Sequence, residues 1–294
     1  MQFFLEILIN GVLTGSLYGL TALGLTLIFG VMKIINFAHG TFLMVCMYIV
    51  YGLGVGCGLD PYLSILMVVP AAFIIGYLSQ VVFVQSVFKA ERDVREPVGV
   101  LLLTAGLWIA VNNLFLMIFG ANFRSLKTPY SDQVFEIGEM MISRPLFYAF
   151  VISLATTALL SLFLKRTHMG RAIRVVGQDR EAASLMGIDI YRVYRLAFGV
   201  GIATLGVAGA IIVPMLYVHP FAGDIYDIRA FVIVVLGGLG SVPGALLGGI
   251  IVGVIESVAS QYLNMSWSAA LIYMVFLLVL FSRPQGIFGF EKDS

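Results

Sequence analysis

The sequence predicts an all-α protein, a polytopic transmembrane helical bundle, from its composition and from the spacing of its charges. Of the 294 residues, 60% are hydrophobic and only 11% are charged, and the mean hydropathy is +1.02. Soluble domains carry about 25% charged residues. Long runs nearly free of Lys, Arg, Asp and Glu recur along the chain. Helices are expected there because a helix satisfies its own backbone hydrogen bonds in lipid, and the alternating pattern of a transmembrane barrel is missing.

The clearest spans are six apolar runs, each long enough to cross a hydrocarbon core of about 30 Å, which takes roughly 20 residues. They cover residues 5–29, 62–88, 97–119, 146–164, 196–217 and 244–262. Shorter apolar segments bring the expected total to eight or nine crossings. The first run has no basic segment before it and no small-residue cleavage site after it, so we expect a retained span and not a signal peptide. Residues 1–294 are expected to form a single transmembrane domain.

Two glycine-rich stretches predict interruptions of the helices. GLTLIFGVMKIINFAHGTFLM, residues 24–44, holds Lys33, Asn36 and His39 within apolar sequence. VVLGGLGSVPGALLGGIIVG, residues 234–253, combines glycines, which weaken a helix, with Pro243, which has no amide hydrogen. Each stretch is either a broken or re-entrant helix or a simple interfacial turn. Non-helical backbone at membrane depth is tolerated only where protein or a watery cavity meets it, so the first alternative points to a transport pathway.

Glycines also recur at four-residue spacing near both ends of the chain. The two series are Gly11, Gly15 and Gly19, and Gly240, Gly244 and Gly248. This spacing places small residues on one helix face and predicts close helix contacts. A duplicated or inverted architecture is the alternative interpretation.

Basic residues predict the orientation, because Lys and Arg in short loops stay on the cytoplasmic side. Residues 165–195 hold seven of the 17 basic residues and only three acidic ones, and a second basic loop holds Lys89, Arg92 and Arg95. Both loops are expected in the cytoplasm. Residues 120–145, a segment near 218–227 and the N-terminus of the first helix are then external. Within the external loop, VFEIGEMMI, residues 134–142, predicts a hairpin around Gly138.

The loop 165–195 contains a short amphipathic helix. Gly177 gives a turn, Asp179 is suited to cap a helix by accepting an amide hydrogen bond, and Gly187 gives a C-terminal stop. The helix between them, residues 180–186, has about two turns, too few to cross a membrane or to be stable alone. It needs a surface, which is either the lipid headgroups or a groove on a cytoplasmic partner.

Three long segments resemble one family of transport proteins. EAASLMG, residues 181–187, fits the EAA-three-residues-Gly loop through which ABC importer permeases engage their ATPase subunits. Three segments are similar to LivH-type branched-chain amino acid ABC permeases: GLTLIFGVMKIINFAHGTFLM, VGQDREAASLMGID and FVIVVLGGLGSVPGALLGGIIVGVIE. The resemblance covers nearly the whole chain. It assigns ATPase coupling to Asp179, Glu181, Ala182, Ala183 and Gly187.

The resemblance implies a multi-pass permease of the bacterial inner membrane that imports branched-chain amino acids. The implied partners are a homologous second permease, two cytoplasmic ABC ATPases, a periplasmic amino-acid-binding protein and membrane lipid, but no nucleic acid. No lysine follows a glycine, so the chain has no P-loop and ATP is expected to be hydrolysed by the partner subunits. We expect no bound cofactor, no metal site and no catalytic residue. Import of another amino acid, urea or a short amide is the alternative within the same class.

Polar residues within the apolar runs are candidates for the translocation pathway: Asn36, His39, Gly40 and Glu256. His39 either forms a hydrogen bond across a broken helix or is a structural histidine near the cytoplasmic interface. Glu256 is a functional candidate because intramembrane carboxylates usually are, yet it lies about 9 Å from the end of its span, where interfacial water is the alternative partner. An ion-driven secondary transporter is the rival function, and Glu256 would be its coupling site. A membrane-embedded enzyme is not expected, since the sequence has no HExxH motif.

Overall fold

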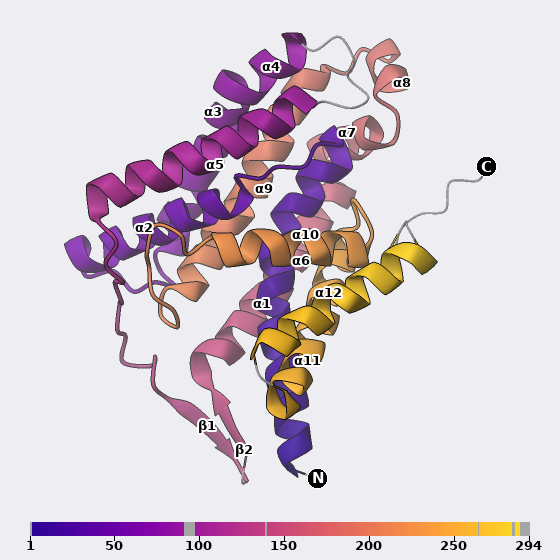
Figure 1. Cartoon of the computed structure of the whole chain (residues 1–294). Helices are drawn as coiled ribbons and strands as arrows, with labels where there is room; N and C mark the ends of the chain where they lie inside the picture. The colour runs from indigo at the N-terminus through magenta and orange to yellow at the C-terminus, as the bar shows by residue number, and fades with distance from the viewer. Residues whose placement is uncertain (1, 91–97, 139, 264, 284–285, 289–294) are drawn as a thin grey trace.

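Helices dominate the described part of the chain, and its two strands form one small hairpin (Figure 1). The computed structural model describes residues 2–90, 98–138, 140–263, 265–283 and 286–288. The helices are α1 Gln2–Met32, α2 His39–Cys57, α3 Ile65–Ser79, the π-helical turn η1 Gln80–Val84, α4 Gln85–Ala90, α5 Val98–Phe119, α6 Arg144–Arg166, α7 His168–Gln178, α8 Arg180–Leu185, α9 Ile190–Ile212, α10 Asp224–Gly237, α11 Val242–Tyr262 and α12 Met265–Ser282. The strands are β1 Val134–Ile137 and β2 Met140–Ser143. The predicted all-α class is confirmed.

The described residues of each of the six apolar runs lie mainly in helices. In the described part of the chain, seven helices are long and apolar enough to cross a membrane, counting the continuous run 65–90 as one. They are α1, α2, the run from α3 to α4, α5, α6, α9 and α11. Helix α12 contains one further, shorter apolar helical stretch, so the predicted eight or nine crossings stand as an approximate count.

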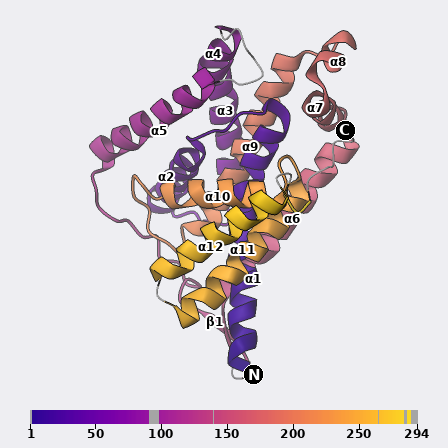
Figure 2. The same ribbon diagram turned by 45° about the vertical axis from the view of Figure 1, so that its right-hand side comes forward.

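The two ends of the bundle carry different elements, and we call them the loop end and the hairpin end. Figures 1 and 2 show α4, α7 and α8 together at the loop end, while β1 and β2 lie near the start of α1 at the hairpin end. This arrangement agrees with the predicted sidedness, because residues 165–195 and Lys89 share one end. Strand β1 pairs antiparallel with β2 as predicted. Arg92, Arg95 and Glu139 lie outside the described residues.

The centre of the bundle is formed by α1 and α9, which are buried along most of their length, whereas α5 and α6 are mostly exposed. Helix α1 packs along α11 through its glycine series: a Cβ at Gly15 would lie 2.6 Å from Cα of Ile250. The second series does not meet the first. Gly244 instead contacts Gly237 of α10 so closely that a Cβ at Gly244 would clash with the Gly237 carbonyl oxygen. Small residues therefore set the spacing between α11 and the two helices α1 and α10.

The helices are interrupted at both predicted places. Helix α1 ends at Met32, the next residue Lys33 has a left-handed φ of 56°, and α2 begins only at His39. Helices α10 and α11 are separated by residues 238–241, in which Gly238 and Gly240 have φ values of 94° and 90°. Pro243 follows in the first turn of α11, where its missing N–H costs nothing.

Helix α10 lies across α1 at mid-height in both views (Figures 1 and 2). The prediction of an external loop over residues 218–227 was wrong for its last part, because Asp224 and Asp227 stand in the first turn of α10. Carboxylates are favourable there, since the N-terminus of a helix carries partial positive charge. Helices α10 and α11 thus form a pair that is interrupted at residues 238–241.

Candidate functional site

The short helix of the loop 165–195 is held by its cap residues. Oδ1 of Asp179 accepts hydrogen bonds from the backbone N–H groups of Glu181 and Ala182, at 2.9 and 3.0 Å. At the other end Gly187 has a left-handed φ of 80°. Its N–H donates to the carbonyl of Ser184, and the N–H of Ile188 donates to that of Ala183, the pattern of a Schellman C-cap. The sequence-predicted roles of Asp179 and Gly187 in shaping α8 are confirmed.

Helix α8 buries Ala183, leaves Arg180 half-buried and exposes its other residues. Ala183 is completely buried, whereas Glu181 and Ala182 are exposed. Leu185 and Met186 are 90% and 77% exposed, although both are large and apolar. Figures 1 and 2 place α8 at the outer edge of the loop end. An apolar pair presented this openly at the tip of the molecule is typical of a protein-binding surface.

The loop 165–195 also touches the end of the central helix. Gly177 of α7 packs so closely on α1 that a Cβ there would lie 2.8 Å from the carbonyl oxygen of Gly30. On its other side Gly30 faces Gly240, and a Cβ at Gly30 would lie 2.8 Å from Cα of Gly240. Glycine contacts thus connect α7, the end of α1 and the break between α10 and α11.

The second candidate site surrounds the break between α1 and α2. Oδ1 of Asn36 accepts a hydrogen bond from the N–H of Ala38 at 3.1 Å, and the carbonyl of Asn36 accepts one from the N–H of His39. The buried His39 ring meets the carbonyl oxygen of Thr21 through Nε2 at 2.8 Å. Thr21 lies about 16 Å along α1 from its end at Met32. His39 is thus a buried histidine that forms a hydrogen bond with the backbone of α1, and its position relative to the membrane interface stays a prediction.

The N-termini of α2 and α10 meet beside this break. Gly40 and Gly223 are in direct backbone contact, and a Cβ on either would clash with the carbonyl oxygen of the other. Asp227 accepts a short hydrogen bond from the N–H of Gly40. One carboxylate of α10 therefore caps the first turn of α2, where the partial positive charges of two helix N-termini would otherwise face each other.

A second carboxylate, Asp224, connects α10 to α5. Its Oδ1 accepts hydrogen bonds from Nε1 of Trp108 at 2.9 Å and from Nδ2 of Asn112 at 3.0 Å. The side-chain oxygen of Asn112 accepts in turn from the hydroxyl of Thr41 on α2, at 3.1 Å. This network holds three helices together around the N-terminus of α10.

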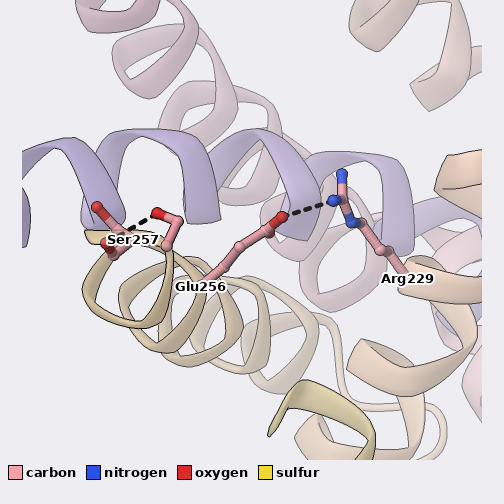
Figure 3. A network of polar contacts seen from close by, with 4 residues as sticks. Arg229, Glu256 and Ser257 are labelled. Atoms are coloured by element: carbon pink, nitrogen blue, oxygen red, sulfur yellow. Dashed lines mark hydrogen bonds and ion pairs between the residues drawn. The ribbon is translucent and has the colours of Figure 1, made fainter. Parts of the chain in front are cut away.

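Glu256 belongs to α11 and forms an ion pair with Arg229 of α10. Its Oε1 lies 2.5 Å from an Arg229 guanidinium nitrogen, and the two side chains are 21% and 19% exposed (Figure 3). The guanidinium also lies over the Tyr18 ring, 4.7 Å from its centroid. The neighbouring Ser257 donates to the carbonyl of Ile7 at 2.8 Å. Glu256 therefore belongs to a contact that joins α1, α10 and α11.

The structure brings together three of the four predicted pathway residues, Asn36, His39 and Gly40, and places Glu256 apart from them. Their roles in transport stay predictions. Three charged residues of α10 that contact these sites were not singled out from the sequence: Asp224, Asp227 and Arg229. The signal for these residues was their position directly before the apolar run 230–237, because charges next to or inside a membrane segment usually pair or serve a pathway.

Comparisons with known proteins agree over nearly the full length. The family described as the permease component of the branched-chain amino acid transport system matches residues 7–280. The chain is 31% identical to the high-affinity branched-chain amino acid transport system permease protein LivH of Salmonella typhimurium, over 98% of this chain and 96% of that protein. It is 30% identical to LivH of Escherichia coli K12, over the same shares. It is 32% identical to the corresponding permease BraD of Pseudomonas aeruginosa, over 97% of this chain and 96% of BraD. No solved structure matches the chain significantly.

Proposed function

Because the chain belongs to the family of branched-chain amino acid transport system permeases, we propose that it is the permease subunit of an ATP-driven importer of branched-chain amino acids. It is a multi-pass membrane protein, and we place it in the bacterial inner membrane. Full-length similarity to permeases named for this transport carries the proposal. A matching pathway would be lined mainly by apolar side chains, as the surroundings of Asn36 are.

The proposed assembly combines this chain with three other kinds of subunit. A homologous second permease completes the pathway, two cytoplasmic ATPases bind at the loop end, and a periplasmic amino-acid-binding protein delivers substrate at the hairpin end. The exposed Leu185 and Met186 support an ATPase contact through α8, because a cap at each end holds this helix in place beyond the bundle. Coupling to the ATPase is then assigned to Asp179, Glu181, Ala182, Ala183 and Gly187. ATP is bound and hydrolysed by the partner subunits. The close contact of Gly177 with Gly30 would transmit a movement of the ATPase to α1.

Uptake tests the function directly. The chain, expressed with its partner subunits in cells lacking other leucine transporters, is expected to import leucine only while ATP is present. Loss of ATP with a maintained proton gradient should stop uptake. Uptake that followed the proton gradient instead would support the ion-driven alternative, which the pairing of Glu256 with Arg229 disfavours. Competition by isoleucine, valine, urea and short amides would define the substrate class.

Loss of the exposed apolar pair should release the ATPase. Leu185→Asp and Met186→Asp are each expected to reduce co-purification of the ATPase at least about tenfold, because truncation at the centre of an interface often costs 2 kcal/mol or more. The matched control is Met141→Asp, which changes another exposed methionine, 60% exposed in β2 at the hairpin end. Co-purification should survive in this control. Full ATPase recovery with both α8 variants would remove α8 from the contact.

Gly187 is expected to act through backbone conformation rather than through direct contact. A Cβ at Gly187 would meet no atom of the chain, but φ of 80° is strained for a β-branched side chain. Gly187→Val should therefore weaken ATPase co-purification, whereas Gly187→Asn should largely retain it, since asparagine tolerates the left-handed region. Equal loss in both variants would instead indicate that the partner contacts this position directly and has no room for a side chain.

A further inference from the structure

An open groove lies between α7 and the start of α9 at the loop end. Its volume is about 480 Å³, which is within the range of small-molecule sites. The apolar part of its lining includes Ala172, Val175 and Ile188, and its basic residues are His168, Arg171 and Arg192. An apolar surface flanked by basic side chains suits a molecule that has both an anionic and an apolar part.

Two of the basic residues have a charge that no acidic group of the described chain neutralises. Arg171 of α7 and Arg192 of α9 are exposed, and neither forms an ion pair with a described residue. Asp189 also lines the groove, but its Oδ1 accepts from the backbone N–H of Arg192 and not from the guanidinium. The Arg171 guanidinium makes one long contact, at 3.3 Å, to the carbonyl oxygen of Arg166. Both guanidinium groups can therefore bind an anion.

Close packing fixes the groove at the end of the membrane spans. Gly170, beside Arg171, packs on the last turn of α6, where a Cβ at Gly170 would lie 2.6 Å from Cα of Leu164. The apolar run 146–164 ends at this leucine. On the other side, Arg192 lies four residues before the apolar run of α9, about 6 Å along the helix. Both arginines thus lie where apolar spans give way to the basic loop, which is the depth of the lipid headgroups.

Helix α7 also has the pattern of an interfacial helix. It buries Gly170, Ile173 and Val176, while Arg171 and Arg174 are exposed. A basic amphipathic helix lies in the plane of the membrane interface and is attracted to anionic lipids. Basic pockets between transmembrane helices on the cytoplasmic side likewise bind lipid headgroups. An acidic segment of a partner protein would meet the same charges, but the depth of the groove favours a lipid.

We propose that this groove binds one anionic phospholipid of the cytoplasmic leaflet. The guanidinium groups of Arg171 and Arg192 donate to the phosphate oxygens, which they match in geometry and in charge. The first methylene groups of the acyl chains contact Ala172, Val175 and Ile188. The site does not depend on which substrate is transported, so a failure of the proposed function would leave it unaffected.

Native mass spectrometry of the purified full chain in neutral detergent, titrated with phosphatidylglycerol, tests the site. The first phosphatidylglycerol is expected to bind at least about tenfold more tightly than phosphatidylcholine, whose choline group cancels the charge of the phosphate. Arg171→Gln and Arg192→Gln should each raise the Kd for phosphatidylglycerol about tenfold. Arg174→Gln is the matched control, because Arg174 is exposed on the same helix but does not line the groove, and it should bind like the unmodified chain.

Four outcomes would overturn the proposal. Equal affinity for the two lipids, or an equal loss of binding in Arg174→Gln, would indicate general attraction to a basic surface and no defined site. Ala172→Trp fills the groove without a change of charge, so undiminished phosphatidylglycerol binding in that variant would place the lipid elsewhere. Displacement of the lipid by inorganic phosphate, but not by chloride at the same ionic strength, would indicate a site for the free anion. Loss of the ATPase with retained lipid binding in Arg171→Gln and Arg192→Gln would make the groove a protein contact.

Discussion

Gly40→Ala is expected to destabilise the permease by about 3 kcal/mol, because overpacking costs about 1–3 kcal/mol and a lost hydrogen bond to a charged group about 1.5–3 kcal/mol. The added Cβ would clash with the carbonyl oxygen of Gly223 and lie 2.7 Å from Oδ2 of Asp227. Neither group can move aside without a loss of stability, because the Gly223 carbonyl is part of the backbone and the Asp227 carboxylate caps α2. The thermal unfolding midpoint of the purified full chain in detergent measures the effect.

Gly52→Ala is the matched control on the same helix. A Cβ at Gly52 meets no atom within 4 Å, and alanine is the better helix former, so this variant should unfold at the same temperature or higher. Gly223→Ala should behave like Gly40→Ala because it adds a methyl group to the other side of the same contact. If Gly40→Ala proved as stable as Gly52→Ala, the N-termini of α2 and α10 would not be in backbone contact.

The spans and the short helix α8 could be predicted because their causes are local. An apolar run of some 20 residues determines a membrane helix whatever surrounds it. Asp179 caps α8 through amide groups two and three residues ahead, and Gly187 ends it through bonds within the same turn. Lys33 and Pro243 likewise marked the two breaks from within the sequence.

Helix α10 could not be predicted in full because its polar half depends on distant partners. Asp224 and Asp227 resemble a solvated loop until Trp108 and Gly40 are known to donate to them. These donors lie 116 and 187 residues away in the chain. For the same reason the sequence indicated the polar residues of the break but not Asp227, the carboxylate that caps α2 beside them.

The pair of Arg229 and Glu256 gives the second large expected effect. Arg229→Met and Glu256→Met each leave one charge without its partner inside the bundle. We expect each to destabilise the chain by about 3 kcal/mol, the lower end of the cost for a fully buried pair, because both side chains are about one fifth exposed. The double variant removes both charges and should recover most of the lost stability, since apolar residues of similar volume replace a buried pair well. Thermal unfolding of the four proteins completes the cycle.

Uptake by the double variant then decides what Glu256 does. If the carboxylate only holds α10 against α11, restoring stability restores ATP-dependent leucine uptake, and the ion-driven alternative loses its coupling residue. If Glu256 takes part in the pathway, the double variant folds but does not transport, because methionine can neither accept nor release a proton or bind an ammonium group. Glu256→Met with unchanged stability would contradict the ion pair itself. Stability and transport thus separate the packing role, which the geometry in Figure 3 supports, from the pathway role predicted from the sequence.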